Sequence, residues 1–159
     1  MTDDPVRATA DDPVRATADD VHAWLAEPGV DDDGSLRTLD TALTTALPDA
    51  TRRLWRGTFW GGTTQAIIGY GDIVQARPQG ADAEWFLLGL ARQARYVSLY
   101  VNAAEGRDYL SRAYAERLAA PGSSVKAGAA ALTFLAAADV DLDVLAELAH
   151  HAGRVQPYA

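Results

Sequence analysis

The chain has 159 residues, 48% of them hydrophobic, and a formal net charge of −8 at pH 7. This length suits one domain with one core. The acidic balance argues against nucleic-acid binding, because that affinity comes from neutralising phosphates with basic side chains. The sequence contains no cysteine, which excludes disulfides, thiolate metal sites and a cysteine nucleophile and fits a cytoplasmic location.

The N-terminus is an acidic, duplicated tail. Residues 3–10 read DDPVRATA, and residues 11–18 repeat them identically. This charged, proline-containing composition is typical of disordered chains and unlike a secretory signal. We expect residues 1–19 to be disordered, residues 20–153 to form a single domain and residues 154–159 to be a C-terminal tail. No apolar run is long enough to span a bilayer, so we expect no membrane partner.

Two helices are predicted to open the domain. Residues 20–29, DVHAWLAEPG, place an aspartate before an apolar face and end in Pro-Gly. The acidic run Asp31–Asp33 reads as a solvated loop that leads into the next helix. That helix carries leucines at helical spacing over residues 36–47 and ends before Pro48.

The middle of the chain changes to a strand-like pattern. Strands are predicted at residues 63–71, 72–77, 84–91 and 95–102, and the third is apolar on both faces and therefore central. Helical spacing returns at residues 110–118. A loop at 121–128, a short strand at 130–136 and a helix at 140–152 with Gly153 as its cap complete the chain. Helices at both ends of an antiparallel sheet of about five strands make an α+β domain.

The stretch GTFWGGTTQAIIGYGD, residues 57–72, raises the question of nucleotide binding. Thr63 stands where a phosphate-binding loop needs lysine, and a strand rather than a helix follows. The GYG at residues 69–71 lacks the third glycine of a dinucleotide fingerprint. We therefore interpret the glycines as a tight turn, a bulge or a close approach of a ligand. Plain core packing is the simpler interpretation of the aromatic residues around them.

The candidate ligand-binding residues combine this stretch with neighbouring charges. We expect a glycine-aromatic cleft. Arg92, Arg95 and Lys126 offer a cationic patch for an anion or, equally, pair with Glu84 or Asp82 at the surface. The full set of candidates is Trp60, Gly61, Gly62, Tyr70, Glu84, Trp85, Arg95 and Lys126. The leading hypothesis is a non-catalytic domain that binds a small molecule or a protein partner. Formation of a homodimer is left open.

The spacing of the histidines and acidic residues is not typical of a catalytic or metal-binding site. His150 and His151 are adjacent, so on a helix they point about 100° apart and cannot chelate one ion together; we interpret them as a solvated helix end. The aspartates of DVDLDV, residues 139–144, lack the glycine of a calcium loop and read as a helix N-terminus. An enzyme would need Glu84 or Asp72 as acid or base, and no nucleophile, metal set or cofactor loop supports one.

From Leu54 onward the chain resembles the YdhG-like domain family, described as a domain of unknown function (DUF1801). The matching segments include LWRGTFWGGTTQAIIGYGD, EWFLLGLARQARYVSLYVNAAEG and DVDLDVLAELAHHAG. The family pattern has lysines after the GLA segment and before the last strand; here Ala94 replaces one, and Lys126 alone remains of the others.

The resemblance also implies a second hypothesis. Some relatives are described as frataxin-like iron chaperones, which would use surface acids. We assign Asp72, Asp82 and Glu84 as the candidate iron ligands, since carboxylates suit iron where thiolates are absent. The first hypothesis needs no cofactor, and the second needs iron.

Overall fold

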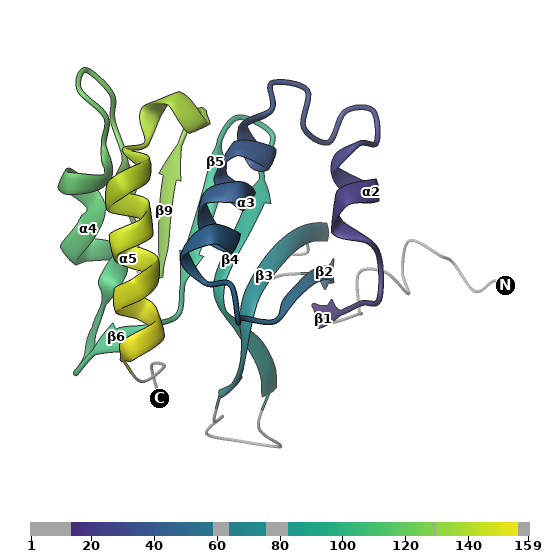
Figure 1. The fold of residues 1–159 in the computed structure, drawn as a ribbon, viewed down its shortest axis with the longest axis horizontal. Coiled ribbons are helices and arrows are strands. Elements are labelled where there is room, and N and C mark those ends of the chain that lie inside the picture. The colour runs from purple at the N-terminus through teal and green to yellow at the C-terminus, as the bar shows by residue number, and fades with distance from the viewer. Residues whose placement is uncertain (1–13, 59–63, 76–82, 129, 156–159) are drawn as a thin grey trace, which may run out of the picture.

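The computed structural model describes residues 14–58, 64–75, 83–128 and 130–155. They form an antiparallel sheet of seven strands in the order β1-β2-β3-β4-β5-β9-β8, and β6 and β7 form a separate two-stranded sheet (Figure 1). The strand bounds are β1 Arg15–Ala16, β2 Arg52–Thr58, β3 Thr64–Gln75, β4 Ala83–Arg92, β5 Val97–Val101, β6 Ala104–Glu105, β7 Asp108–Tyr109, β8 Lys126–Ala127 and β9 Ala131–Phe134.

The helices contribute to one apolar core with the sheet. They are α2 Val21–Leu25, α3 Ser35–Ala46, α4 Leu110–Leu118 and α5 Leu142–Arg154, with a 3₁₀ turn, η2, at Ala137–Asp139. Helix α5 packs against both α3 and α4. In Figure 1, α3 and α5 lie side by side in front of the strands. The helices and strands share one large apolar core, so the predicted α+β class with an antiparallel sheet is confirmed.

The predicted centre of the sheet is also correct, although the sheet has more strands than expected. Strand β4 holds the fourth of seven positions. Residues 64–75 form one strand, β3, rather than the two predicted on either side of residue 72. Strand β2 was not predicted because three arginines interrupt its apolar pattern, and the two-residue strands β1 and β8 are too short to carry a period.

The end of the duplicated tail is ordered, which differs from the expectation of disorder through residue 19. Strand β1 pairs antiparallel with β2. Thr17 donates from its backbone N–H and its hydroxyl to the carbonyl of Leu54, at 2.9 Å and 2.7 Å. Asp19 forms an ion pair with Arg56 at 2.8 Å. These contacts continue the sheet by one strand at the edge beyond β2.

Helix starts use aspartates, though not always as predicted. Asp31 is buried rather than solvated, because its carboxylate accepts the backbone N–H groups of Leu36 and Arg37 at 2.7 Å and 3.1 Å. These N–H groups have no partner within the first turn of a helix. Asp141 accepts N–H bonds from Asp143 and Val144 at the start of α5. The interpretation of DVDLDV as a helix N-terminus is therefore confirmed.

A second apolar cluster lies on the sheet face away from these helices. It consists of Trp55, Ile67, Phe86 and Ala91, with Trp85 and Tyr100 packed against it. Leu54 belongs to the large core and Trp55 to the second cluster, as expected for consecutive residues of a strand. The second face is therefore aromatic, and β1 reaches it through Ala16.

No helix among the described residues is long and apolar enough to cross a membrane.

Candidate functional site

Among the described residues, the predicted ligand-binding residues do not all line one cleft. Tyr70 is 1% exposed and belongs to the core beneath the helices. Arg95 is exposed in the turn between β4 and β5, and Lys126 is exposed on the edge strand β8. Of the five candidates that the structure describes, Glu84 and Trp85 line a common hollow. Trp60, Gly61, Gly62 and Asp82 lie outside the described residues.

Tyr70 is part of a buried polar network in the core. Its hydroxyl donates to Oδ1 of Asp40 at 2.6 Å, and Arg52 holds the same carboxylate with contacts of 2.9 Å and 2.5 Å. Burial, followed by the charge of Asp40, raises the pKa of Tyr70 well above its ordinary value. The network ties α3 to β2 and β3, and Tyr70 is not a wall of the cleft.

The hollow that contains Glu84 and Trp85 lies at one end of strands β2, β3 and β4. We call it the indole cleft and define it by the residues that line it: Arg53, Trp55, Asp72, Ile73, Val74, Glu84 and Trp85. Its volume is about 170 Å³. This is below the roughly 300–1,000 Å³ of typical pockets for drug-sized ligands. The cleft therefore suits a small molecule or one end of a larger one.

Two indoles form a corner of the cleft. The ring centroids of Trp55 and Trp85 are 5.7 Å apart and the planes meet at 69°. Trp85 also stacks on Phe86, with centroids 4.5 Å apart and planes 25° apart. Trp55 is 3% exposed, and its buried indole N–H has no hydrogen-bond acceptor in the described part of the chain. The cleft wall is therefore buried at Trp55 and half-buried at Trp85.

Charged groups form the rim of the cleft. Arg53 and Asp72 make an ion pair at 3.0 Å, with side chains 47% and 44% exposed. Glu84 is exposed and has no hydrogen bond or ion pair to another described residue. The three groups sum to one negative charge. Sequence reasoning missed Arg53; its place two residues before Trp55 would have put both on one face, had β2 been predicted.

A left-handed glycine brings Asp72 to this rim. Gly71 has φ 81°, a conformation that side chains other than glycine's disfavour. Before it, Tyr70 and its partner Leu88 face the large core. After it, Asp72 lines the cleft and its partner Phe86 joins the aromatic cluster. Residues two positions apart normally face the same side of a sheet. The change of faces at Gly71 therefore explains why Tyr70 lies in the core while Asp72 lines the cleft.

Two of the three acidic residues assigned as candidate iron ligands lie in the described part of the chain. Asp72 and Glu84 line the same cleft, while Asp82 lies outside the described residues. Arg53 neutralises Asp72. Within the described ranges no group of three histidine, cysteine, aspartate or glutamate residues is placed to hold a metal ion. Iron binding therefore stays a prediction.

One of the two adjacent histidines is partly buried, which differs from the prediction of a solvated helix end. His151 is half-buried, its Nε2 lies 2.7 Å from Oε1 of Glu105, and its Nδ1 lies 3.0 Å from the hydroxyl of Tyr114. His150 is exposed as predicted. These contacts tie α5 to α4 and to β6, so His151 is interpreted as part of the packing between these elements.

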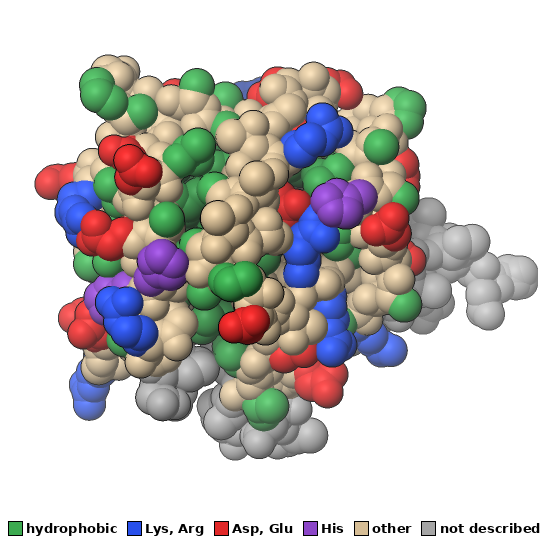
Figure 2. All heavy atoms as spheres, viewed as in Figure 1, with side chains coloured by type: hydrophobic (Ala, Val, Ile, Leu, Met, Phe, Trp, Pro, Cys, Tyr) green, Lys and Arg blue, Asp and Glu red, His purple; other side chains and the backbone are tan. Residues whose placement is uncertain are grey.

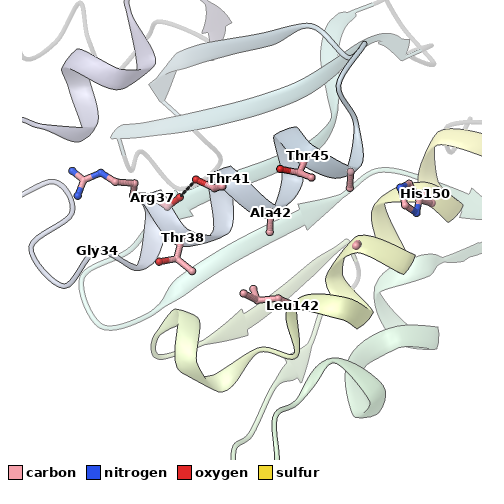
Figure 3. Close-up of a pocket in the computed structure, with 10 residues that line it drawn as sticks. Gly34, Arg37, Thr38, Thr41, Ala42, Thr45, Leu142 and His150 are labelled. Atoms are coloured by element: carbon pink, nitrogen blue, oxygen red, sulfur yellow. Dashed lines mark hydrogen bonds between the residues drawn. The ribbon is translucent and has the colours of Figure 1, made fainter.

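A larger hollow lies between α3 and α5. It has a volume of about 710 Å³ and is lined by the residues drawn in Figure 3, mostly threonines and alanines. Figure 2 shows it as a furrow with hydrophobic side chains at its bottom and few charges along it. In Figure 3 the side chain of Arg37 points away from Leu142. Small residues on two neighbouring helices produce such furrows, and no charged groups converge in this one.

Among the described residues, a strand rather than a helix follows the glycine-rich stretch, as predicted. Thr58 at the end of β2 pairs with Thr64 at the start of β3, so the glycine-rich stretch joins two antiparallel strands. No helix N-terminus follows it to receive a phosphate.

Comparison of the chain with protein-family models, with curated proteins and with solved structures finds no match.

Proposed function

We propose that this protein is a non-catalytic binding protein whose ligand occupies the indole cleft. The observation that carries the proposal is the convergence of Trp55, Trp85 and Glu84 on one hollow outside the helix-covered core. The carboxylate of Glu84 has no ion pair to another residue in the described part of the chain. Apolar walls with a few polar groups that fix orientation are the usual composition of a ligand site. A cytoplasmic location and the YdhG-like resemblance remain parts of the same proposal.

The chemistry of the cleft favours binding over catalysis. Glu84 is exposed, and a carboxylate acting as acid or base is expected in a site that excludes water. Asp72 is held in an ion pair with Arg53 at the surface. No serine or threonine lines the cleft to act as a nucleophile in the described part of the chain.

Thermal shift measurements against a panel of small metabolites test the proposal, because a ligand that binds only the folded state raises the melting temperature. We expect at least one compound to stabilise the protein, and Trp85→Leu or Glu84→Gln to abolish that shift. Arg95→Gln and Lys126→Gln are matched controls, since both residues are exposed and outside the cleft. A shift lost in the controls but kept in the cleft variants would place the ligand elsewhere and refute the proposal.

A further inference from the structure

The outer edge of strand β2 is covered by a sequence that the chain carries twice. Residues 3–12 and residues 11–20 both read DDPVRATADD. We call residues 3–12 copy 1 and residues 11–20 copy 2. Strand β1 belongs to copy 2, and copy 1 lies outside the described residues. The chain therefore holds two identical sequences for one edge of the sheet.

Copy 2 is held at this edge by backbone and side-chain contacts. Its strand pairs antiparallel with β2. The N–H and the hydroxyl of Thr17 both donate to the carbonyl of Leu54, at 2.9 Å and 2.7 Å. Asp19 forms an ion pair with Arg56 at 2.8 Å, and Ala16 packs against the second apolar cluster. On the tail side, each of these contacts comes from a residue of copy 2.

Copy 1 carries every group that makes these contacts. The same residue types stand eight positions earlier in the chain; they are Val6, Arg7, Ala8, Thr9 and Asp11. The groups on the other side, which are the backbone of β2 and the side chain of Arg56, are the same for either copy. The direct contacts therefore do not discriminate between the two copies.

The connection to helix α2 does discriminate between them. Copy 2 runs directly into the helix, whose first residue is Val21. Copy 1 on the same edge would place the eight residues 13–20 in a loop before Val21. Closing a longer loop costs conformational entropy, but the cost rises only slowly with loop length. Copy 2 is therefore the favoured occupant, and copy 1 can follow it at a modest cost.

An uncovered edge of β2 would be a liability. Without copy 2, the carbonyl of Leu54 loses the two donors of Thr17, and β2 loses its strand partner on that side. Unpaired strand edges are templates for pairing with other chains. A second segment of the same sequence can cover the edge when the first one leaves it.

We propose that the two copies exchange on the outer edge of β2, with copy 2 as the major occupant and copy 1 as its replacement. The replacement comes from the same molecule, because the short connection between the copies gives copy 1 a high effective concentration at the edge. The exchange is independent of the ligand proposed for the indole cleft.

Proline at position 17 tests the exchange in the full chain. Thr17→Pro removes the N–H and the hydroxyl that donate to Leu54, whereas copy 1 keeps both groups in Thr9. Amide hydrogen exchange followed by NMR is expected to show the N–H of Thr9 about tenfold more protected in Thr17→Pro than in the wild type. Unchanged protection of Thr9 would overturn the proposal.

A matched change in copy 1 gives an independent readout. Thr9→Pro is expected to leave the urea midpoint unchanged, because copy 2 still holds the edge. The double variant Thr9→Pro/Thr17→Pro is expected to lower the midpoint by more than the two single changes together, since neither copy then fits. Additive effects would overturn the proposal. Loss of the fold in Thr17→Pro, followed by circular dichroism, would also overturn it, because copy 1 should replace copy 2 there.

Dilution distinguishes exchange within one molecule from exchange between two. Protection of Thr9 in Thr17→Pro that stays the same on dilution supports exchange within the molecule. Protection that falls on dilution, together with a dimer in size-exclusion chromatography, would overturn the proposal in favour of strand exchange between two copies of the chain.

Discussion

Gly69 and Gly89 are register partners in β3 and β4, and the space above them is filled by Trp55 and Phe86. A Cβ on Gly69 would lie 2.4 Å from Nε1 of Trp55, and a Cβ on Gly89 would lie 2.3 Å from Cε1 of Phe86. Because the two glycines have no side chains, the rings of Trp55 and Phe86 can pack directly against the backbone of β3 and β4. Close packing against the aromatic cluster therefore explains why positions 69 and 89 are glycine.

The first prediction concerns the packing of Trp55 against Gly69. Gly69→Ala is expected to destabilise the protein by about 1–3 kcal/mol, because the new methyl group forces a buried indole to move in a packed cluster. Gly153→Ala is the control, since a Cβ there meets its nearest neighbour, Cδ2 of Leu47, at an ordinary 3.5 Å. Urea unfolding of both variants measures the difference. Equal stability of Gly69→Ala and the wild type would show that Trp55 does not lie over Gly69.

The sequence predicted features that depend on neighbouring residues, and it did not predict contacts between residues far apart in the chain. Leucines at helical spacing predicted α3 and α5, and the doubly apolar pattern placed β4 at the centre of the sheet. The pairing of Tyr70 with Asp40 joins residues 30 positions apart, and no local pattern signals it. Tyr70 was therefore assigned to a ligand site, although its alternation with Ile68 puts it in the core.

The prediction of the candidate site was limited in the same way, because the site is formed by residues from different strands. Glu84 and Trp85, which are neighbours in the sequence, line one cleft, but Arg95 and Lys126 were grouped with them by charge alone. Their separation depends on strand order, which single-sequence patterns do not encode. Arg53 was missed because β2 was not recognised, and Asp72 reaches the cleft because the strand changes faces at Gly71.

The second prediction concerns the buried network around Asp40. Asp40→Ala is expected to cost about 3–5 kcal/mol, because it leaves the Arg52 guanidinium and the buried Tyr70 hydroxyl without their partner. Tyr70→Phe is expected to cost only about 1 kcal/mol, since Arg52 still satisfies the carboxylate. Denaturant unfolding compares the two. A Tyr70→Phe variant that is less stable than Asp40→Ala would contradict this division of roles.

The third prediction is a loss of stability in alkali. The pKa of Tyr70 in the folded protein is raised by burial and by Asp40, so the folded state keeps a proton that the unfolded chain loses above about pH 10. The unfolded state then binds fewer protons, and the free energy of unfolding falls as pH rises past that value. Below about pH 10 the contribution is fully present.

Unfolding midpoints from pH 8 to 11 measure this effect. Tyr70→Phe is expected to flatten the alkaline decline. Burial also raises the pKa of Tyr100, so Tyr100→Phe should flatten it as well. Tyr96→Phe, which changes an exposed side chain, is the control. An alkaline decline of unchanged slope in Tyr70→Phe would argue against the buried position of that hydroxyl.

The fourth prediction tests the iron alternative. Because Arg53 already neutralises Asp72, Asp72→Asn is expected to leave any ferrous iron affinity unchanged, within about twofold. Anaerobic titration of the wild type, Asp72→Asn and Glu84→Gln measures it. A large loss of affinity in both variants would instead favour an iron site at the cleft rim, against the organic-ligand account.

The central claim is that a ligand enters the corner formed by Trp55 and Trp85, and indole N–H resonances report on it most directly. Trp24 belongs to the helix-covered core and serves as an internal control. On addition of tetramethylammonium, acetate and tert-butanol in turn, we expect at least one probe to shift the Trp55 and Trp85 signals and leave Trp24 unchanged. Signals of Trp55 and Trp85 that stay fixed with every probe, or a shift confined to Trp24, would contradict the account.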